Sequence, residues 1–233
     1  MKKNLLLVII LIITACNKKE ADLTVKVNIE GLKKGTLFLK KIEDTTLVSV
    51  DSVTVNGVSQ VELYSDLDSP EVFYLYLDKN SAEKDRITFF ADKGVTEINT
   101  VLKNFSFEAQ IKGSKQQKVL EEYRKVISKI NNRSLDLIKD QFEAQKNGDT
   151  VIFDSLVKQK NNTLKRKYLY TVNFALNNKD SEVAPYLALS EIYDARIDLL
   201  DTINNSLTPN VKNSKYGKQL ERFIQNVRQK ENQ

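Results

Sequence analysis

The sequence has no histidine, no tryptophan and only one cysteine among its 233 residues. Histidine is the usual general base near neutral pH and a frequent zinc ligand, so its absence removes both roles. A single cysteine allows neither an internal disulfide nor a Cys-x-x-Cys redox centre. No other catalytic arrangement of residues is visible in the sequence. We therefore expect a protein that is not an enzyme and that has no metal site and no cofactor.

The single cysteine, Cys16, follows a short hydrophobic run at the N-terminus. Two lysines precede this run at residues 5–13, and polar residues dominate from Asn17 onward. A cationic tip, a short apolar core and an exit through small residues are typical of a secretory signal peptide. The run is roughly half the length of about 20 apolar residues that a membrane-spanning helix needs. This segment has two interpretations in which the cysteine carries no lipid. It could be an ordinary signal peptide with an incidental cysteine, or a buried N-terminal segment of the fold.

The segment Ile13-Thr14-Ala15-Cys16 resembles the bacterial lipobox, in which an aliphatic residue and two small residues precede an invariant cysteine. The resemblance implies cleavage between Ala15 and Cys16, a diacylglycerol on the cysteine sulfur and acylation of the new amine. Several acyl chains, each contributing about 0.8 kcal/mol per buried methylene, make such an anchor effectively permanent. We expect residues 1–15 to be a lipoprotein signal peptide and residues 16–22 to be a lipidated tether.

This anchor predicts a protein of the cell envelope, held on a bacterial membrane, with the outer membrane as the first choice. The folded part would then face the periplasm or the cell surface. Lysine and arginine number 36 and aspartate and glutamate 31, which gives a net charge of +5. The two signs are interspersed, whereas nucleic-acid binding needs a concentrated basic face. The densest basic patch, residues 164–168, fits a solvated helix face, so we expect no nucleic-acid partner.

Residues 23–112 follow an alternating pattern of apolar and polar side chains. Val25, Val27 and Ile29 fall on one side of the first run, and several similar runs follow, separated by glycine, asparagine and proline. Short alternating runs at regular spacing are typical of a β-sandwich or a barrel. Asn56-Gly57 between two such runs predicts a hairpin turn. We expect an antiparallel β-sandwich domain over residues 23–112.

Residues 113–233 change to the spacing of three and four residues that an amphipathic helix requires. Ser114 is placed to cap a first helix, and residues 146–150 contain the signals that end it and begin a second. These two helices predict a long antiparallel hairpin whose far part projects from the core. A third helix is expected from Ser181 to about residue 205, and a last one after Ser214. The fold class is therefore α+β, with a sandwich followed by an all-helical domain.

The order of these segments resembles the domain of unknown function 4369. The resemblance rests on runs such as "VNIEGLKKGTLFLKKI" and "RITFFADKGVTEINTVL", on Gly113 with Ser114, on Pro185, and on "SKYGK" at residues 214–218. That domain stands N-terminal to thioredoxin-like domains of the thiol peroxidase or cytochrome-maturation type in many envelope lipoproteins. No thioredoxin domain with a Cys-x-x-Cys motif follows in this sequence, so thiol–disulfide exchange is not implied.

Two groups of residues are candidates for binding. Glu191, Asp194, Asp198 and Asp201 would line one face of the third helix, and carboxylates can hold calcium or magnesium. A solvated or salt-bridged face is the simpler interpretation of this row. Aromatic residues on two neighbouring strands could stack on a glycan or a peptide, although core packing is the alternative: Phe73, Tyr74, Tyr76, Phe89 and Phe90.

The sequence therefore predicts a lipid-anchored envelope protein with a non-catalytic binding or scaffolding role. Its partners would be the membrane, through the lipid, and another envelope protein. One alternative is an accessory subunit for a thioredoxin-like envelope redox protein. A second alternative is a glycan- or peptide-binding module that uses the aromatic strand face.

Overall fold

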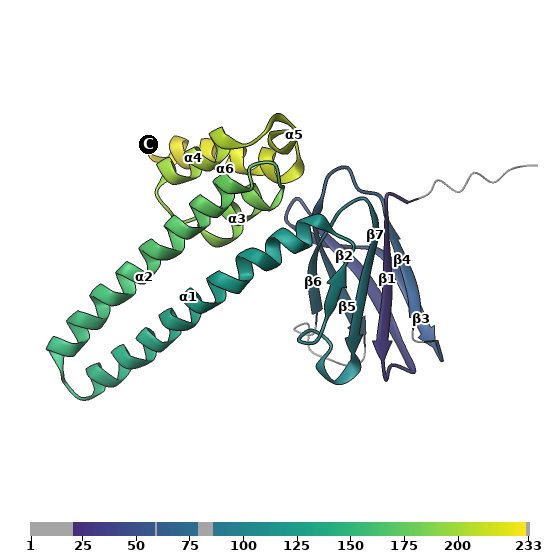
Figure 1. Cartoon of the computed structure of the whole chain (residues 1–233), viewed down its shortest axis with the longest axis horizontal. Coiled ribbons are helices and arrows are strands. Elements are labelled where there is room, and N and C mark those ends of the chain that lie inside the picture. Colours follow the sequence, from purple (N-terminus) through teal and green to yellow (C-terminus); the bar gives the residue numbers. More distant parts are fainter. Residues whose placement is uncertain (1–20, 59, 79–85, 232–233) are drawn as a thin grey trace, which may run out of the picture.

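The computed structural model describes residues 21–58, 60–78 and 86–231, in which strands come first and helices follow (Figure 1). The strands are β1 (Leu23–Glu30), β2 (Lys34–Glu43), β3 (Thr46–Asn56), β4 (Gln60–Ser65), β5 (Glu71–Asp78), β6 (Arg86–Ala91), β7 (Gly94–Val101) and β8 (Gln110–Lys112). The helices are α1 (Lys115–Lys146), α2 (Thr150–Asn177), α3 (Val183–Glu191), α4 (Ile197–Ser206), α5 (Pro209–Lys212) and α6 (Lys215–Glu231). The predicted α+β class is confirmed.

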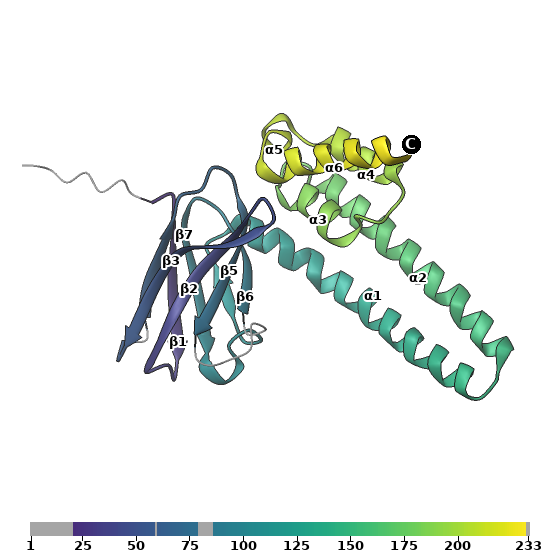
Figure 2. The ribbon, with the colours of Figure 1, turned by 180° about the vertical axis from the view of Figure 1, so that it is seen from behind.

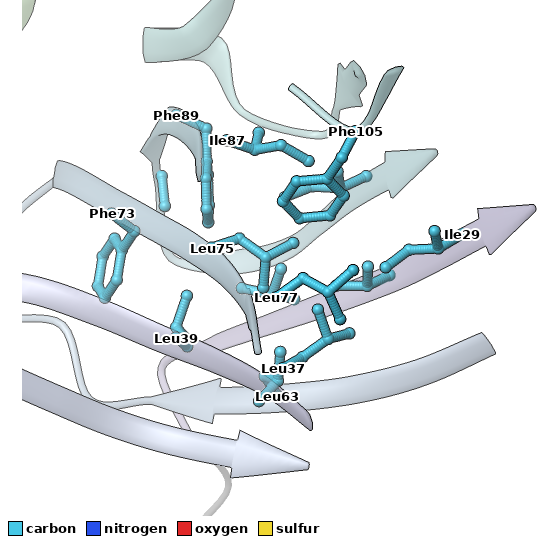
Figure 3. Packing of buried hydrophobic residues seen from close by; sticks show 14 of the residues in the cluster. Ile29, Leu37, Leu39, Leu63, Phe73, Leu75, Leu77, Ile87, Phe89 and Phe105 are labelled. Atoms are coloured by element: carbon cyan, nitrogen blue, oxygen red, sulfur yellow. The ribbon is translucent and has the colours of Figure 1, made fainter. Parts of the chain in front are cut away.

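The strands form two four-stranded sheets that pack face to face. Sheet A has the order β4-β1-β7-β8, and sheet B has the order β3-β2-β5-β6. Burial alternates along the strands, as in β1, because successive side chains point to opposite faces. Leucine, isoleucine, valine and phenylalanine side chains from both sheets fill the space between them (Figure 3). The alternating pattern of the sequence therefore corresponds to a sandwich core.

Two details of the sandwich differ from the sequence-based expectation. The pairing of β1 with β7 is parallel, so the sandwich is not antiparallel throughout. The turn at Asn56-Gly57 is present, with Gly57 at a φ of 84°, but it joins β3 of sheet B to β4 of sheet A. The hairpin prediction was wrong because β3 and β4, although both alternate as expected, do not pair with each other: β3 pairs with β2 in sheet B, and β4 pairs with β1 in sheet A.

Helices α1 and α2 form the long antiparallel hairpin that the sequence predicts, and both views show it extending away from the sandwich (Figures 1 and 2). Ser114 Oγ accepts a hydrogen bond from the Gln117 amide at the start of α1, and Asp149 Oδ1 accepts one from the Ile152 amide at the start of α2. Both residues are N-caps, which satisfy amides that lack partners within a helix.

Steps of three and four residues separate the side chains of α1 that turn toward α2. These are Leu120, Tyr123, Ile127, Ile130, Ser134, Leu137, Gln141 and Ala144, all buried or partly buried. This spacing is the seam of a two-helix coiled coil, in which each helix keeps one narrow stripe against its neighbour. At the base of the hairpin the seam is aromatic, since Tyr123 stacks on Tyr170 and its hydroxyl hydrogen-bonds Thr171 at 2.7 Å.

The single third helix predicted after Ser181 was wrong, because the structure contains two helices there. Helix α3 ends at Glu191, and a turn with a hydrogen bond from the Ala195 amide to the Ile192 carbonyl precedes α4. Ile192 itself is fully buried. The turn redirects the chain so that Leu200 and Ile203 of α4 join Ile192 and α6 residues in one apolar cluster.

Sheet B and the helices share a second apolar cluster. Val72 of β5 and Phe90 of β6 lie in it beside residues from α1, α3 and α6. Two backbone amides of these strands are satisfied by helix side chains: the Val72 amide donates to the Tyr216 hydroxyl at 3.0 Å, and the Phe90 amide donates to Gln117 Oε1 at 2.9 Å. The sandwich and the helical part therefore meet through an apolar contact that also contains hydrogen bonds.

We predict that Tyr216→Phe destabilises the protein by about 1–3 kcal/mol, because it leaves the buried Val72 amide without an acceptor while the ring is kept. Urea denaturation followed by circular dichroism measures this loss. Tyr193→Phe is the matched control, since the Tyr193 side chain is largely exposed. Equal stabilities of the two variants would show that the Val72–Tyr216 contact is energetically unimportant.

Candidate functional site

The outer face of sheet B carries a group of rings and cations that we call the ring surface: Phe38, Lys40, Tyr74, Tyr76 and Arg86. These side chains come from β2, β5 and β6, and the strand register places Phe38 beside Tyr76 and Tyr76 beside Arg86. Alternation along β5 turns Tyr74 and Tyr76 away from the sandwich core. All five side chains are partly or fully exposed.

Cations lie directly over the rings of this surface. Lys40 Nζ is 4.7 Å from the centre of the Tyr76 ring and 5.6 Å from that of Phe38. The Arg86 guanidinium is 4.9 Å from the centre of the Tyr74 ring, and Arg86 Nη1 donates to the Tyr76 hydroxyl at 3.1 Å. Such contacts hold rings and cations in fixed relative positions. The result is a surface on which rings and hydrogen-bond donors alternate, and a ligand that stacks on a ring would use the face away from the cation or displace the cation.

The Tyr74 phenol stays protonated at physiological pH. Its pKa is raised above the ordinary value, first by burial and then by the neighbouring Tyr186, with Arg86 acting in the opposite direction. A neutral phenol can both donate and accept a hydrogen bond, whereas a phenolate can only accept. Tyr74 therefore suits recognition of hydroxyl and amide groups rather than nucleophilic chemistry.

The structure divides the five aromatic residues of the sequence-based candidate site. Phe73 and Phe89 are fully buried between the sheets, where their rings stack at 6.0 Å. Phe90 is fully buried beneath the helices, against Tyr186 and Tyr216. These three rings cannot contact a ligand at the surface, because strand alternation and the helical cover remove them from solvent. Tyr74 and Tyr76 alone of the five reach the ring surface.

The sequence-based candidate site did not include Phe38, Lys40 and Arg86. A signal for them was present, since Phe38 and Lys40 occupy the polar side of the β2 alternation and Arg86 opens β6. The sequence does not reveal the pairing of β2 with β5, which brings residues 34 positions or more apart into one patch.

A buried carboxylate lies at the junction between sheet B and α6. Glu71 is only 4% exposed, and its two oxygens accept hydrogen bonds from Lys41 Nζ at 3.3 Å and from Lys215 Nζ. Lys215 also donates to the Ile42 carbonyl at 2.7 Å. Two lysines thus neutralise one carboxylate, and the same ammonium of Lys215 joins β2, β5 and α6.

A polar pocket of about 390 Å³ opens beside this carboxylate. Its lining mixes acidic, basic and neutral side chains: Lys41, Glu43, Asp44, Asp68, Ser69, Glu71, Asn213, Lys215 and Lys218. Because Glu71 and both of its lysines are already paired with one another, the contacts seen here hold the two halves of the protein together.

Within residues 21–58, 60–78 and 86–231, no three acidic side chains come together in a way that could hold a metal ion. The turn before α4 divides the row of carboxylates from Glu191 to Asp201: Asp194 hydrogen-bonds Tyr168, and the other three form ion pairs. These pairs are Glu191–Lys167 at 3.0 Å, Asp198–Arg196 at 2.5 Å and Asp201–Arg228 at 2.5 Å.

Ala15 and Cys16, the expected cleavage and lipidation residues, lie outside the described part of the chain. Among the described helices, none has the length and apolar character required to cross a bilayer.

Residues 23–120 match the sequence family described as "Domain of unknown function (DUF4369)". The match covers the N-terminal part of the chain. The DUF4369 match runs from the first residue of β1 to Leu120 in the second turn of α1, so it includes Gln117, which satisfies the Phe90 amide. Searches of curated proteins and of solved structures found no match to the chain.

We predict that Glu71→Gln destabilises the protein by about 3 kcal/mol, because it removes the buried carboxylate that Lys41 and Lys215 share, while Lys41 keeps its contact with Glu43 at 3.5 Å. Urea denaturation at neutral pH measures the change. Glu62→Gln is the control, since Glu62 pairs with Lys26 at the exposed surface and its loss should have no measurable effect. A Glu71 variant as stable as the Glu62 variant would contradict the assigned role.

Proposed function

We propose that this protein is a lipid-anchored component of the cell envelope with a non-catalytic binding or scaffolding role. The observation that supports a binding role is the ring surface on sheet B, where Tyr74 and Tyr76 are partly exposed and held by cations. The buried ionisable side chain Glu71 contributes instead to the contact between sandwich and helices. The partly exposed tyrosines are therefore available for binding, whereas the buried Glu71 stabilises the fold.

The start of the fold is compatible with an anchor at Cys16. Asp22 is fixed to the sandwich, since it accepts a hydrogen bond from the Leu67 amide at 3.0 Å and forms an ion pair with Lys93 at 3.0 Å. Residues 16–22 can span at most about 25 Å when extended. A lipid on Cys16 would therefore keep sheet A and sheet B within a short distance of the bilayer, on the periplasmic or the cell-surface side.

We predict that Cys16→Ser abolishes labelling by a radioactive or clickable fatty acid in growing cells and allows a high-salt wash to move the protein from the membrane to the soluble fraction. The reason is that serine lacks the thiol that receives the diacylglycerol. Fractionation of cells that express the variant and the unchanged chain measures both effects. Labelling that persists in the variant would contradict the anchor.

A glycan- or peptide-binding module is the more specific form of this proposal, and the ring surface supports it. Aromatic faces stack on sugar rings and peptide groups, and the adjacent Lys40 and Arg86 supply hydrogen-bond donors. The likeness to lipoproteins with thioredoxin-like domains supports the other alternative, an accessory subunit of an envelope redox protein. Crosslinking in cells that consistently recovers a thioredoxin-like protein would favour that alternative.

We predict that a glycan or peptide ligand raises the melting temperature of the unchanged chain, since a ligand that binds only the folded form stabilises it. A thermal-shift screen with envelope glycans and short peptides measures this rise. Tyr76→Ala should abolish the shift, because it removes the ring between Lys40 and Arg86. Tyr193→Ala, which removes another partly exposed ring, should retain it; a shift that survives in Tyr76→Ala would place the ligand elsewhere.

A further inference from the structure

The far half of the α1–α2 hairpin carries an unusual number of exposed apolar side chains. On α1, Leu135 is 63% exposed, Ile138 46% and Phe142 70%. On α2, Leu164 is 44% exposed and Val157 is partly exposed. We call these five residues the hairpin apolar face. A cluster of exposed apolar side chains of this kind marks an interaction site, because single exposed apolar residues are common on protein surfaces but clusters of them are not.

Helix geometry places all five on the same side of the hairpin. The seam residues of this part of α2 are Phe153, Leu156 and Thr163, all buried or partly buried. Each residue of the face immediately follows a seam residue: for example, Ile138 follows Leu137, Val157 follows Leu156 and Leu164 follows Thr163. In a right-handed helix each residue is turned by about 100° from the one before it. A residue that directly follows a seam residue in the sequence therefore lies on one side of the hairpin, and a residue that directly precedes a seam residue lies on the opposite side. Because the two helices are antiparallel, the residues that follow seam residues in α1 and in α2 lie on the same side of the hairpin.

The opposite side of the hairpin carries mainly polar side chains, although Ile152 is 52% exposed there, and one hydrogen bond identifies this side. Arg133 immediately precedes a seam residue of α1, and its Nη2 donates to Gln159 Oε1 of α2 at 3.0 Å. A small groove on this side is lined by Lys129, Ile130, Arg133, Thr163 and Arg166. Acidic residues of α1 also belong to this side, since each precedes a seam residue: Asp136, Asp140 and Glu143. The five residues of the hairpin apolar face therefore share one side of the hairpin, and the charged and amide side chains named here lie on the other.

Lysines border the hairpin apolar face, although cations are not confined to this border, since Lys129, Arg133 and Arg166 line the groove on the opposite side. Four exposed lysines stand two positions after seam residues, at the outer edge of this face: Lys139, Lys146, Lys158 and Lys165. Asp154 is the one carboxylate of residues 130–146 and 150–165 that follows a seam residue. Bulky apolar side chains with a lysine border are the pattern of helices that lie in the interface of an anionic membrane.

We propose that the hairpin apolar face lies on an anionic lipid surface. Leu135 and Phe142 project from the ridge of α1, and a bilayer accepts projecting side chains without needing a shaped pocket. Self-association of two copies of the protein through this face is disfavoured, because the lysines that border the two faces would repel each other. The apolar face points perpendicular to the plane of the two helices, and that plane is also the broad plane of the molecule (Figure 1). A flat bilayer can therefore meet the hairpin along its length.

This inference rests in part on the proposed function, since a lipid on Cys16 would hold the hairpin close to a bilayer and raise its effective concentration there. The test separates the two ideas by using the full chain with Cys16→Ser, which has no lipid. The sequence contains no tryptophan, so a single introduced indole reports on one position. Phe142→Trp places it on the hairpin apolar face, and Ile152→Trp places it on the polar side at a similar distance from the tip.

We expect the emission of the Phe142→Trp chain to shift to shorter wavelength, and to be quenched by bromine-labelled acyl chains, when vesicles of phosphatidylglycerol and phosphatidylethanolamine are added. The Ile152→Trp chain should show neither effect. Adding Lys139→Gln and Lys146→Gln should weaken the response of the Phe142→Trp chain by about thirtyfold, since each lysine near an anionic surface favours binding by about fivefold. Vesicles of phosphatidylcholine alone should give a similarly weak response.

Three results would overturn the inference. They are an unshifted Phe142→Trp spectrum on anionic vesicles, an equal shift for Ile152→Trp, and an equal response to neutral and anionic vesicles. The first result is expected if the natural partner of this face is an acidic protein and not a lipid surface, because anionic vesicles would then leave the Phe142→Trp spectrum unshifted. Circular dichroism confirms that each variant is helical, which the exposure of Phe142 and Ile152 favours. Loss of acyl labelling or of membrane location concerns Cys16 and leaves this test unaffected.

Discussion

The structure depends on how sheet B is completed by side chains from the helices. The amides of Val72 and Phe90 point away from their strand partners, and a buried amide without an acceptor costs stability comparable to a lost hydrogen bond. Tyr216 and Gln117 supply the acceptors, and Glu71 adds a buried ionic contact to α6. The sandwich would expose apolar surface and unpaired amides if the helices were removed, so the two halves stabilise each other.

This contact determines what each surface can do. Because α1, α3 and α6 cover one end of the outer face of sheet B, Phe90 is buried there while Tyr74 and Tyr76 remain accessible beside it. The same contact fixes only the base of the hairpin. The far part of α1 and α2 has no neighbour other than the partner helix among the described residues, which leaves both of its sides open to solvent (Figure 2).

Local signals in the sequence predicted local structure well. The alternating runs correspond to strands, and Ser114 and Asp149 cap the helices, because both signals depend on residues a few positions apart. The parallel pairing of β1 with β7 could not be predicted, since it is decided by packing between distant segments. The same holds for the contact of Glu71 with Lys215, 144 positions later. For the aromatic candidate site, alternation predicted that Phe73 and Tyr74 face opposite ways, but the burial of Phe90 depends on helices that follow in the chain.

The position of β1 in sheet A has a mechanical consequence. This strand lies between β4 and β7, with backbone pairing to β7 from Leu23 to Glu30 and to β4 from Leu23 to Asn28. Tension applied to the N-terminal end of β1 would act along the strand, so hydrogen bonds on both of its edges would share the load in shear and would not open one at a time. A chain pulled from residue 22 would resist unfolding far better than one pulled from an edge strand.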